Sequence, residues 1–158
     1  VSMGNDKFNL RGAYARMDLN HTDSAVASKN SALWSVGAKI STSPVFFIAE
    51  YARRKLNSQA LLSMKGFYVT AGLRLDKWMP ALTFANVKTT NTPTALTKES
   101  PEKQTSYTLS CDYYINSNML AKLNASLVRP QDGTDGFFTA DPGKKSVYVF
   151  GAELDAIF

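Results

Sequence analysis

The chain has 158 residues, of which 44% are hydrophobic and 11% aromatic, so a disordered chain is excluded and a single domain is the simplest organisation. A formal net charge of +5 suits an anionic partner, whether nucleic acid, a phosphate-rich membrane surface or a small anion. No run of 18 apolar residues occurs, which excludes a transmembrane helix but not transmembrane strands. Cys111 is the only cysteine, so no internal disulfide can form. Neither an initiator Met nor a secretory signal stands at Val1, which indicates a mature form or a piece of a longer chain.

Apolar and polar side chains alternate with a period of two in eight segments, which predicts eight β-strands. In the first segment Phe8, Leu10 and Tyr14 share one parity, whereas Asn9 and Arg11 share the other. The fifth segment is the least regular, because small residues occupy the parity opposite its large apolar ones. The expected strands cover residues 6–19, 34–41, 45–54, 66–75, 80–87, 106–113, 119–127 and 147–158.

The last segment shows the alternation most clearly. Tyr148, Phe150 and Leu154 fall on one face of an extended strand, and Glu153 and Asp155 fall on the other. A helix would mix these acidic residues among the apolar ones, since its period is 3.6. The segment is therefore predicted to be a strand with one apolar and one polar face.

The connections between the expected strands alternate between long and short. Long polar segments cover residues 20–31, 55–65, 89–104 and 129–144, while tight turns cover residues 42–44, 76–79 and 116–118. Every long loop is thus expected at one end of the sheet and every short turn at the other. Each pass offers about 9 to 11 residues, the length with which a tilted strand crosses a bilayer.

Periodicity alone cannot say whether the apolar parity faces a core or lipid, because a soluble ligand-binding barrel shows the same alternation. Three observations favour lipid. The polar parity is rich in Gly, Ser and Thr, which suit a crowded interior rather than a solvated surface. The long and short connections alternate strictly. Aromatic residues gather near strand ends on the apolar parity, as in membrane barrels: Phe8, Trp34, Phe67, Tyr107, Tyr113 and Phe158.

Residues 66–80 and 106–116 resemble the hairpins of proteobacterial porins, in which a strand of aromatic residues, Gly and Arg runs into a tight turn. The ending at Phe158 resembles the terminal strand that outer-membrane barrels present to the barrel-assembly machinery. The resemblance implies an all-β, transmembrane, antiparallel up-and-down β-barrel of the bacterial outer membrane, with long exterior loops and short periplasmic turns. Because porins of this kind have about 16 strands, the chain is either a complete barrel domain over residues 1–158 or the C-terminal portion of a larger one. Such porins are often homotrimers.

If the polar parity lines a lumen, its ionisable groups set the permeation properties. These groups are Lys7, Arg11, Lys39, Glu50, Arg54, Arg74, Asp112, Lys122, Glu153 and Asp155, and the nine from Arg11 onward are the predicted pore-lining residues. Arg11, Lys39, Arg74 and Lys122 would give a mild anion preference to a channel for passive diffusion of small hydrophilic solutes. In a closed eight-stranded barrel the same charges would instead pair with one another, giving a membrane anchor or surface-binding protein. A soluble ligand-binding barrel is the third alternative.

The remaining motifs are weaker evidence for a function. The run Arg53, Arg54 and Lys55 at the start of a long loop could meet lipopolysaccharide phosphates or form a solvated rim. His21 is the only histidine and lies in a polar loop, which offers no catalytic or metal site. Residues 132–136 indicate a turn, because they lack the spaced carboxylates of a calcium loop. No nucleotide-binding motif occurs, and basic and aromatic residues lie on opposite faces, against nucleic-acid binding. We therefore expect neither an enzyme nor a cofactor.

Overall fold

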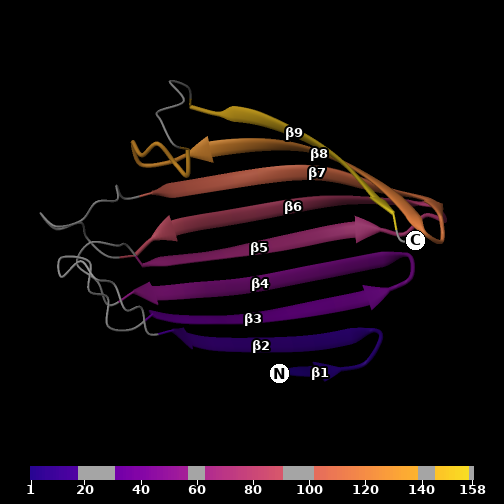
Figure 1. The fold of residues 1–158 in the computed structure, drawn as a ribbon, viewed down its shortest axis with the longest axis horizontal. Coiled ribbons are helices and arrows are strands. Elements are labelled where there is room, and N and C mark those ends of the chain that lie inside the picture. Colours follow the sequence, from indigo (N-terminus) through magenta and orange to yellow (C-terminus); the bar gives the residue numbers. More distant parts are fainter. Residues whose placement is uncertain (18–30, 57–62, 91–101, 139–144, 157–158) are drawn as a thin grey trace, which may run out of the picture.

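The computed structural model describes residues 1–17, 31–56, 63–90, 102–138 and 145–156, and these form a single antiparallel β-sheet (Figure 1). Its nine strands lie in the order in which they occur in the chain, each paired with the next. Their bounds are β1 Ser2–Gly4, β2 Phe8–Met17, β3 Ser31–Thr42, β4 Val45–Leu56, β5 Met64–Leu73, β6 Trp78–Thr89, β7 Lys103–Asn116, β8 Met119–Pro130 and β9 Val147–Ala156. The predicted all-β, antiparallel, up-and-down arrangement is confirmed.

The sheet has one strand more than the eight predicted. The additional strand, β1, is three residues long and pairs with β2 through Ser2 and Arg11. Asn5 shapes the turn between them, because its side-chain Oδ1 accepts hydrogen bonds from the backbone N–H groups of Lys7 and Phe8 at 2.9 and 2.8 Å. Three residues are too few for an alternation to be recognised, and β1 therefore has no periodic signal in the sequence.

Several strands are longer than predicted at the ends that meet connections. The predicted turn over residues 76–79 shrinks to Asp76 and Lys77, because Leu75 and Trp78 exchange two backbone hydrogen bonds of 2.8 and 2.9 Å. Asp76 adopts the left-handed conformation at φ 51°, which suits a two-residue turn. β8 runs on through Pro130, which was predicted to lie in a loop.

The predicted alternation of long and short connections is confirmed. The strand ends that long connections join lie together at the left of Figure 1, and the short turns lie at the right. We call these two edges the loop end and the turn end. The connection from β1 to β2, which the sequence did not predict, is also short and also lies at the turn end.

The register keeps the two predicted faces apart across the whole sheet. Ala38 pairs with Leu10 and Ala49, and Ala49 pairs with Val69, so apolar residues meet apolar residues from strand to strand. We call this side, which includes Phe8, Trp34, Phe47, Val69, Leu109, Leu123 and Phe150, the apolar face, and the opposite side the polar face.

The apolar face is turned outward. Phe150 is 76% exposed, Leu123 62%, Val69 43% and Trp34 38%. The only large apolar residues that are buried among the described ones are Phe46 and Val128, and both lie on the polar face. Such an extent of exposed apolar surface marks contact with lipid or another protein rather than with water. The large apolar side chains of this face therefore form no core among the described residues, and its orientation away from a lumen stays a prediction.

Aromatic rings on the apolar face gather near both ends of the strands, as predicted. Between the middle of the strands and the loop end, the ring of Phe84 lies 5.7 Å from Phe67 and 5.2 Å from Tyr107, measured between centroids. Near the turn end, Trp78 and Tyr113 lie 4.4 Å apart. Phe158 lies outside the described residues. Rings at these two levels are typical of proteins whose surface meets a membrane interface on both sides.

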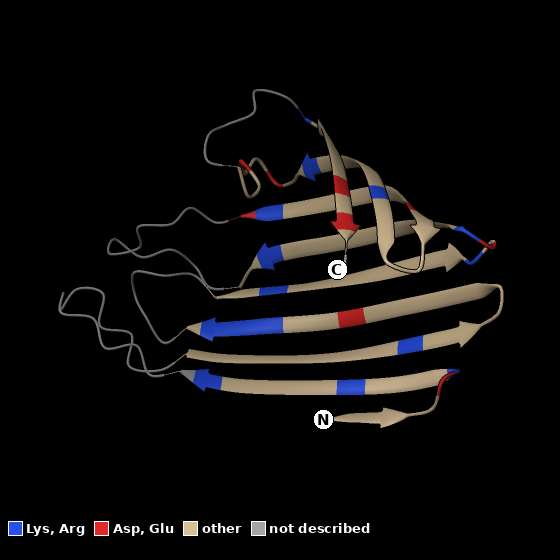
Figure 2. Cartoon of the chain, turned by 45° about the vertical axis from the view of Figure 1, so that its right-hand side comes forward, with Lys and Arg blue, Asp and Glu red and all other residues tan. Residues whose placement is uncertain are grey.

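The sheet is open. β1 and β9 form its two edges, and no pairing between them occurs in the described part of the chain. The sheet also coils, so that β8 and β9 turn away from the plane of β2 to β6 (Figures 1 and 2). No helix among the described residues is long and apolar enough to cross a membrane.

Candidate pore-facing surface

The structure brings the predicted ionisable residues together on the polar face. Arg11 pairs in register with Gly37, and Gly37 pairs with Glu50, so the row crosses β2, β3 and β4 on one side of the sheet. The other predicted ionisable residues lie on this same side of the sheet. The residues on this face are Arg11, Lys39, Glu50, Arg54, Arg74, Asp112, Lys122, Glu153 and Asp155.

Arg11 and Glu50 form an ion pair across the intervening strand β3. Tyr68 on β5 joins them: its hydroxyl lies 3.2 Å from Arg11 Nη2, which donates to it, and donates in turn to Glu50 at 3.2 Å. Gly37 leaves the room for this contact, since a Cβ there would lie 3.1 Å from Arg11 Nε. Tyr68 was not among the predicted site residues, although its place on the polar parity, between Phe67 and Val69 of the apolar parity, was a signal that could have singled it out.

Arg74 lies at the turn end of the polar face, directly after β5. Its Nη1 donates a 2.8 Å hydrogen bond to Ser41 on β3, and its guanidinium carbon lies 4.9 Å from the centroid of the Phe46 ring. Phe46 in turn covers Gly72. Arg74 is thus positioned by a hydroxyl and an aromatic ring, neither of which neutralises its charge.

Lys122 on β8 contacts both acidic residues of β9. Its Nζ lies 3.3 Å from Glu153 and 2.5 Å from Asp155. Asp112 on β7 stands opposite Lys122 in register from the other side. This corner of the polar face therefore combines one cation with three carboxylates.

Lys39 and Arg54 complete the set. Lys39 stands opposite Ile48, and Arg54 donates to the sulfur of Met64 at 3.0 Å near the loop end. Between the charged clusters lie two pairs of hydroxyl groups, Thr70 with Thr83 at 2.8 Å and Thr108 with Ser126 at 2.7 Å, in one row with Ile48 and Val149. The charged groups of this face come from six different strands and the end of β5.

A polar surface opposite an exposed apolar one is how the wall of a transmembrane barrel is built. Comparison with known families decides the matter, because residues 1–132 match the model of the Gram-negative porins. The chain belongs to the Gram-negative porin family. This membership places it in the bacterial outer membrane, in a family of channels rather than enzymes. No match was found among curated individual proteins.

The match includes β1 to β8 of this porin and ends before β9. Both hairpin segments whose resemblance to porins was noted, residues 66–80 and 106–116, fall inside it. The terminal strand, with Glu153 and Asp155, falls outside it. Its assignment to the same wall rests on its ten register pairs with β8.

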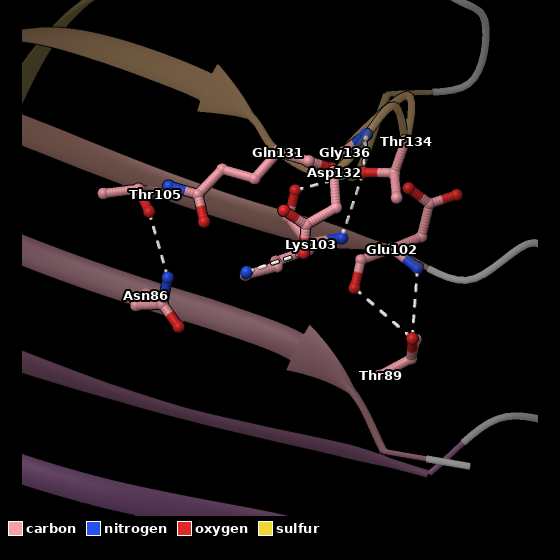
Figure 3. A network of polar contacts seen from close by, with 9 residues as sticks. All are labelled: Asn86, Thr89, Glu102, Lys103, Thr105, Gln131, Asp132, Thr134 and Gly136. Carbon is pink, nitrogen blue, oxygen red and sulfur yellow. Dashed lines mark hydrogen bonds and ion pairs between the residues drawn. The ribbon is translucent and has the colours of Figure 1, made fainter. Parts of the chain in front are cut away.

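A second polar cluster lies at the loop end of this porin (Figure 3). Lys103 Nζ lies 2.7 Å from Asp132, and the Lys103 backbone N–H donates to Thr134 at 3.2 Å. The hydroxyl of Thr134 also lies 3.2 Å from the carbonyl oxygen of Lys103, to which it can donate, so Thr134 holds the turn after β8 against β7; within the turn, it lies 2.8 Å from the carbonyl oxygen of Gln131. The predicted turn over residues 132–136 is present, with left-handed φ angles at Asp132, Gly133 and Gly136.

The carboxyl group of Glu102 in this cluster lies in an unfavourable environment for a negative charge. Its backbone N–H donates to Thr89 at 3.1 Å, but its carboxyl Oε2 is buried and has no hydrogen-bond partner among the described residues. Burial, and secondly the nearby Asp135, raise the pKa of the Glu102 carboxyl. No group of three or more metal-binding side chains occurs among the described residues, and His21 lies outside them.

Proposed function

We propose that this porin is a channel for passive diffusion of small hydrophilic solutes with a mild preference for anions, and that the nine ionisable residues of the polar face line the pore. The observation that carries the proposal is the charge pattern on that face. The ion pairs leave the acidic residues Glu50, Glu153 and Asp155 with cationic partners, whereas Lys39, Arg54 and Arg74 contact no carboxylate among the described residues. Five of the nine residues are cationic and four are acidic. The three cations without a carboxylate contact lie on β3, on β4 and after β5, and there they support attraction of anions and repulsion of cations.

The hydroxyl groups between the charges support a water-filled path. Thr70, Thr83, Thr108 and Ser126 can exchange hydrogen bonds with water or with a passing solute without holding it. We infer that the protein is not an enzyme, because the family it belongs to is one of channels.

Recording ion currents across planar lipid bilayers tests the proposal. We expect stepwise, ohmic conductance, and in a KCl gradient a reversal potential displaced towards that of chloride. The double variant Lys39→Glu/Arg74→Glu should displace it towards potassium, because both side chains lie on the polar face without a carboxylate partner. The matched control Lys39→Arg/Arg74→Lys keeps both charges and should behave as the wild type.

The alternative is a closed barrel that serves as a membrane anchor or surface-binding protein. It is favoured if correctly folded protein gives no current. A current whose selectivity is the same in the wild type and in Lys39→Glu/Arg74→Glu would contradict the assignment of pore-lining residues while leaving the channel intact. The homotrimer and the barrel-assembly machinery remain predictions, and Phe158, which would contact that machinery, lies outside the described residues.

A further inference from the structure

Four cations stand in direct register on four adjacent strands of the apolar face, at the loop end. Arg53 on β4 pairs with Lys65 on β5, Lys65 pairs with Lys88 on β6, and Lys88 pairs with Lys103 on β7. We call these four residues the cationic ladder. They lie on the outward side of the wall, opposite the pore-facing surface, because their parity is that of Phe67 and Tyr107.

More cations on the same face and at the same end extend the ladder. Arg16 and Lys55 both pair with Ala32, and Arg129 pairs with Thr105. Figure 2 shows blue segments, which mark Lys and Arg, at the loop ends of several strands. At the turn end the outward strand residues are uncharged, among them Phe8, Ile40, Phe47, Leu73, Trp78 and Met119. Among the outward strand residues, positive charge is thus confined to the loop end.

Without a bound anion, the like charges of the cationic ladder repel one another and destabilise the sheet. Neighbouring strands lie about 4.8 Å apart, and like charges directly opposite each other destabilise a sheet. Asp132 neutralises the positive charge of Lys103 through an ion pair. Glu102 and Asp135 also lie near Lys103, at the loop end of β7. Arg53, Lys65 and Lys88 have no carboxylate within ion-pair distance among the described residues. An anion from outside the chain would remove this repulsion.

The surroundings point to an anion that belongs to a lipid. Trp34 pairs in register with Arg53, and the rings of Phe67 and Phe84 lie on the same face between the ladder and the middle of the strands. Farther along, Val69 and Leu82 are exposed apolar side chains. A molecule with a phosphate headgroup and acyl chains matches this order of cations, aromatic rings and apolar side chains, because Trp and Tyr prefer the headgroup level.

We propose that the cationic ladder binds the phosphate groups of phosphorylated lipids in the leaflet at the loop end. Arginine can bind phosphate through two parallel N–H donors, and lysine binds it as a point charge. Of the run Arg53, Arg54 and Lys55, only Arg53 and Lys55 take part, since Arg54 lies on the polar face with Met64. The proposal rests on the outward orientation of the apolar face and not on ion conduction.

The test measures lipid binding by the full chain in a neutral detergent, using native mass spectrometry. The probe is lipid A with two phosphates, compared with the same glycolipid after removal of its phosphates and with inorganic phosphate. We expect the wild type to bind the phosphorylated lipid in preference to both. Lys65→Gln/Lys88→Gln should weaken this binding roughly 25-fold, because each basic residue beside an anionic lipid surface contributes about a factor of five.

Two matched variants sharpen the result. Lys7→Gln/Lys77→Gln removes the same charge at the turn end and should bind as the wild type, and Lys65→Arg/Lys88→Arg should also retain binding. The proposal is overturned if Lys65→Gln/Lys88→Gln binds unchanged, if the turn-end variant loses as much affinity, or if removing the phosphates makes no difference. Should the ladder variant not fold, wild-type affinity must still fall with rising salt; salt-independent binding would overturn the proposal. None of these outcomes depends on conductance.

Discussion

At the scale of single residues, two glycines differ in the space that surrounds them. A Cβ on Gly72 would overlap the ring of Phe46 and lie 2.9 Å from the carbonyl oxygen of Pro80, whereas a Cβ on Gly12 would meet only the carbonyl oxygen of Ser35 at 3.9 Å. Phe46 is one of the few buried apolar side chains and supports Arg74. The glycine at position 72 is therefore a requirement of packing on the polar face.

We expect Gly72→Ala to lower the free energy of unfolding by about 1–3 kcal/mol, as overpacking does elsewhere. The matched control Gly12→Ala should change it by less than about 0.5 kcal/mol, because it meets no close neighbour. Urea titration of the protein folded into lipid vesicles measures both. Equal losses for the two variants would show that Phe46 does not rest on Gly72.

The buried carboxyl of Glu102 predicts a dependence of stability on pH. Its pKa in the folded protein is raised, so the folded state binds the proton more tightly than the unfolded state and loses stability as the pH rises from the unfolded pKa through the folded one. Glu102→Gln should therefore be more stable than the wild type at pH 7 and equally stable below the ordinary pKa of glutamate, about 4.3.

The measurement is urea unfolding of both proteins at pH 7 and pH 3.5. Asp135→Asn should reproduce the gain at pH 7 to a smaller extent, since Asp135 raises the pKa of Glu102 less than burial does. A glutamine variant that is less stable than the wild type at pH 7 would mean that the Glu102 carboxylate has a favourable partner.

At the scale of strands, β9 is the edge of the sheet and is joined to β8 by backbone pairing and by the contacts of Lys122 with Glu153 and Asp155. Lys122→Gln leaves these two carboxylates, which share one face of β9, without their cation. We expect faster amide hydrogen exchange in β9 and unchanged exchange in β3 and β4. The triple variant Lys122→Gln/Glu153→Gln/Asp155→Asn removes the repulsion and should restore slow exchange; if it does not, the charges do not hold β9.

Strands and faces could be predicted from the sequence because the signals are local. Alternation of apolar and polar residues and the turn residues at 42–44 and 116–118 lie within a few positions of one another. Prediction from these local signals failed where a strand was very short or contained a residue typical of loops. β1 is three residues long, and Pro130 looked like a loop residue although it lies in β8.

Contacts between strands could not be predicted, because they depend on register. Tyr68 reaches Arg11 only because three consecutive strand pairings place the two residues in one row across the sheet. The cationic ladder likewise joins Arg53 to Lys103, 50 positions apart in the chain. The sequence contains each cation, but the offsets that align the four are set by the lengths of the turns and strands between them.

At the scale of the whole molecule, a transmembrane wall accounts for three features together: the exposed apolar face, the ion pairs on the polar face and the cations at the loop end. In the proposed arrangement, the wall of this porin separates lipid from a hydrophilic interior. Reading the two faces residue by residue along one strand tests this directly, because neighbouring positions on a strand point to opposite sides. β8 suits the test, since Leu123 and Ala125 lie on the apolar face and Asn124 and Ser126 on the polar face.

The measurement uses single cysteines at these four positions in a Cys111→Ala background, since Cys111 is the only native cysteine. The protein is folded into lipid vesicles and treated with a charged, membrane-impermeant maleimide. We expect Asn124→Cys and Ser126→Cys to react, and Leu123→Cys and Ala125→Cys to stay protected until detergent is added. Reaction of Leu123→Cys and Ala125→Cys with protection of the other two would contradict the assignment of the faces, and with it the proposed pore and the lipid-binding ladder.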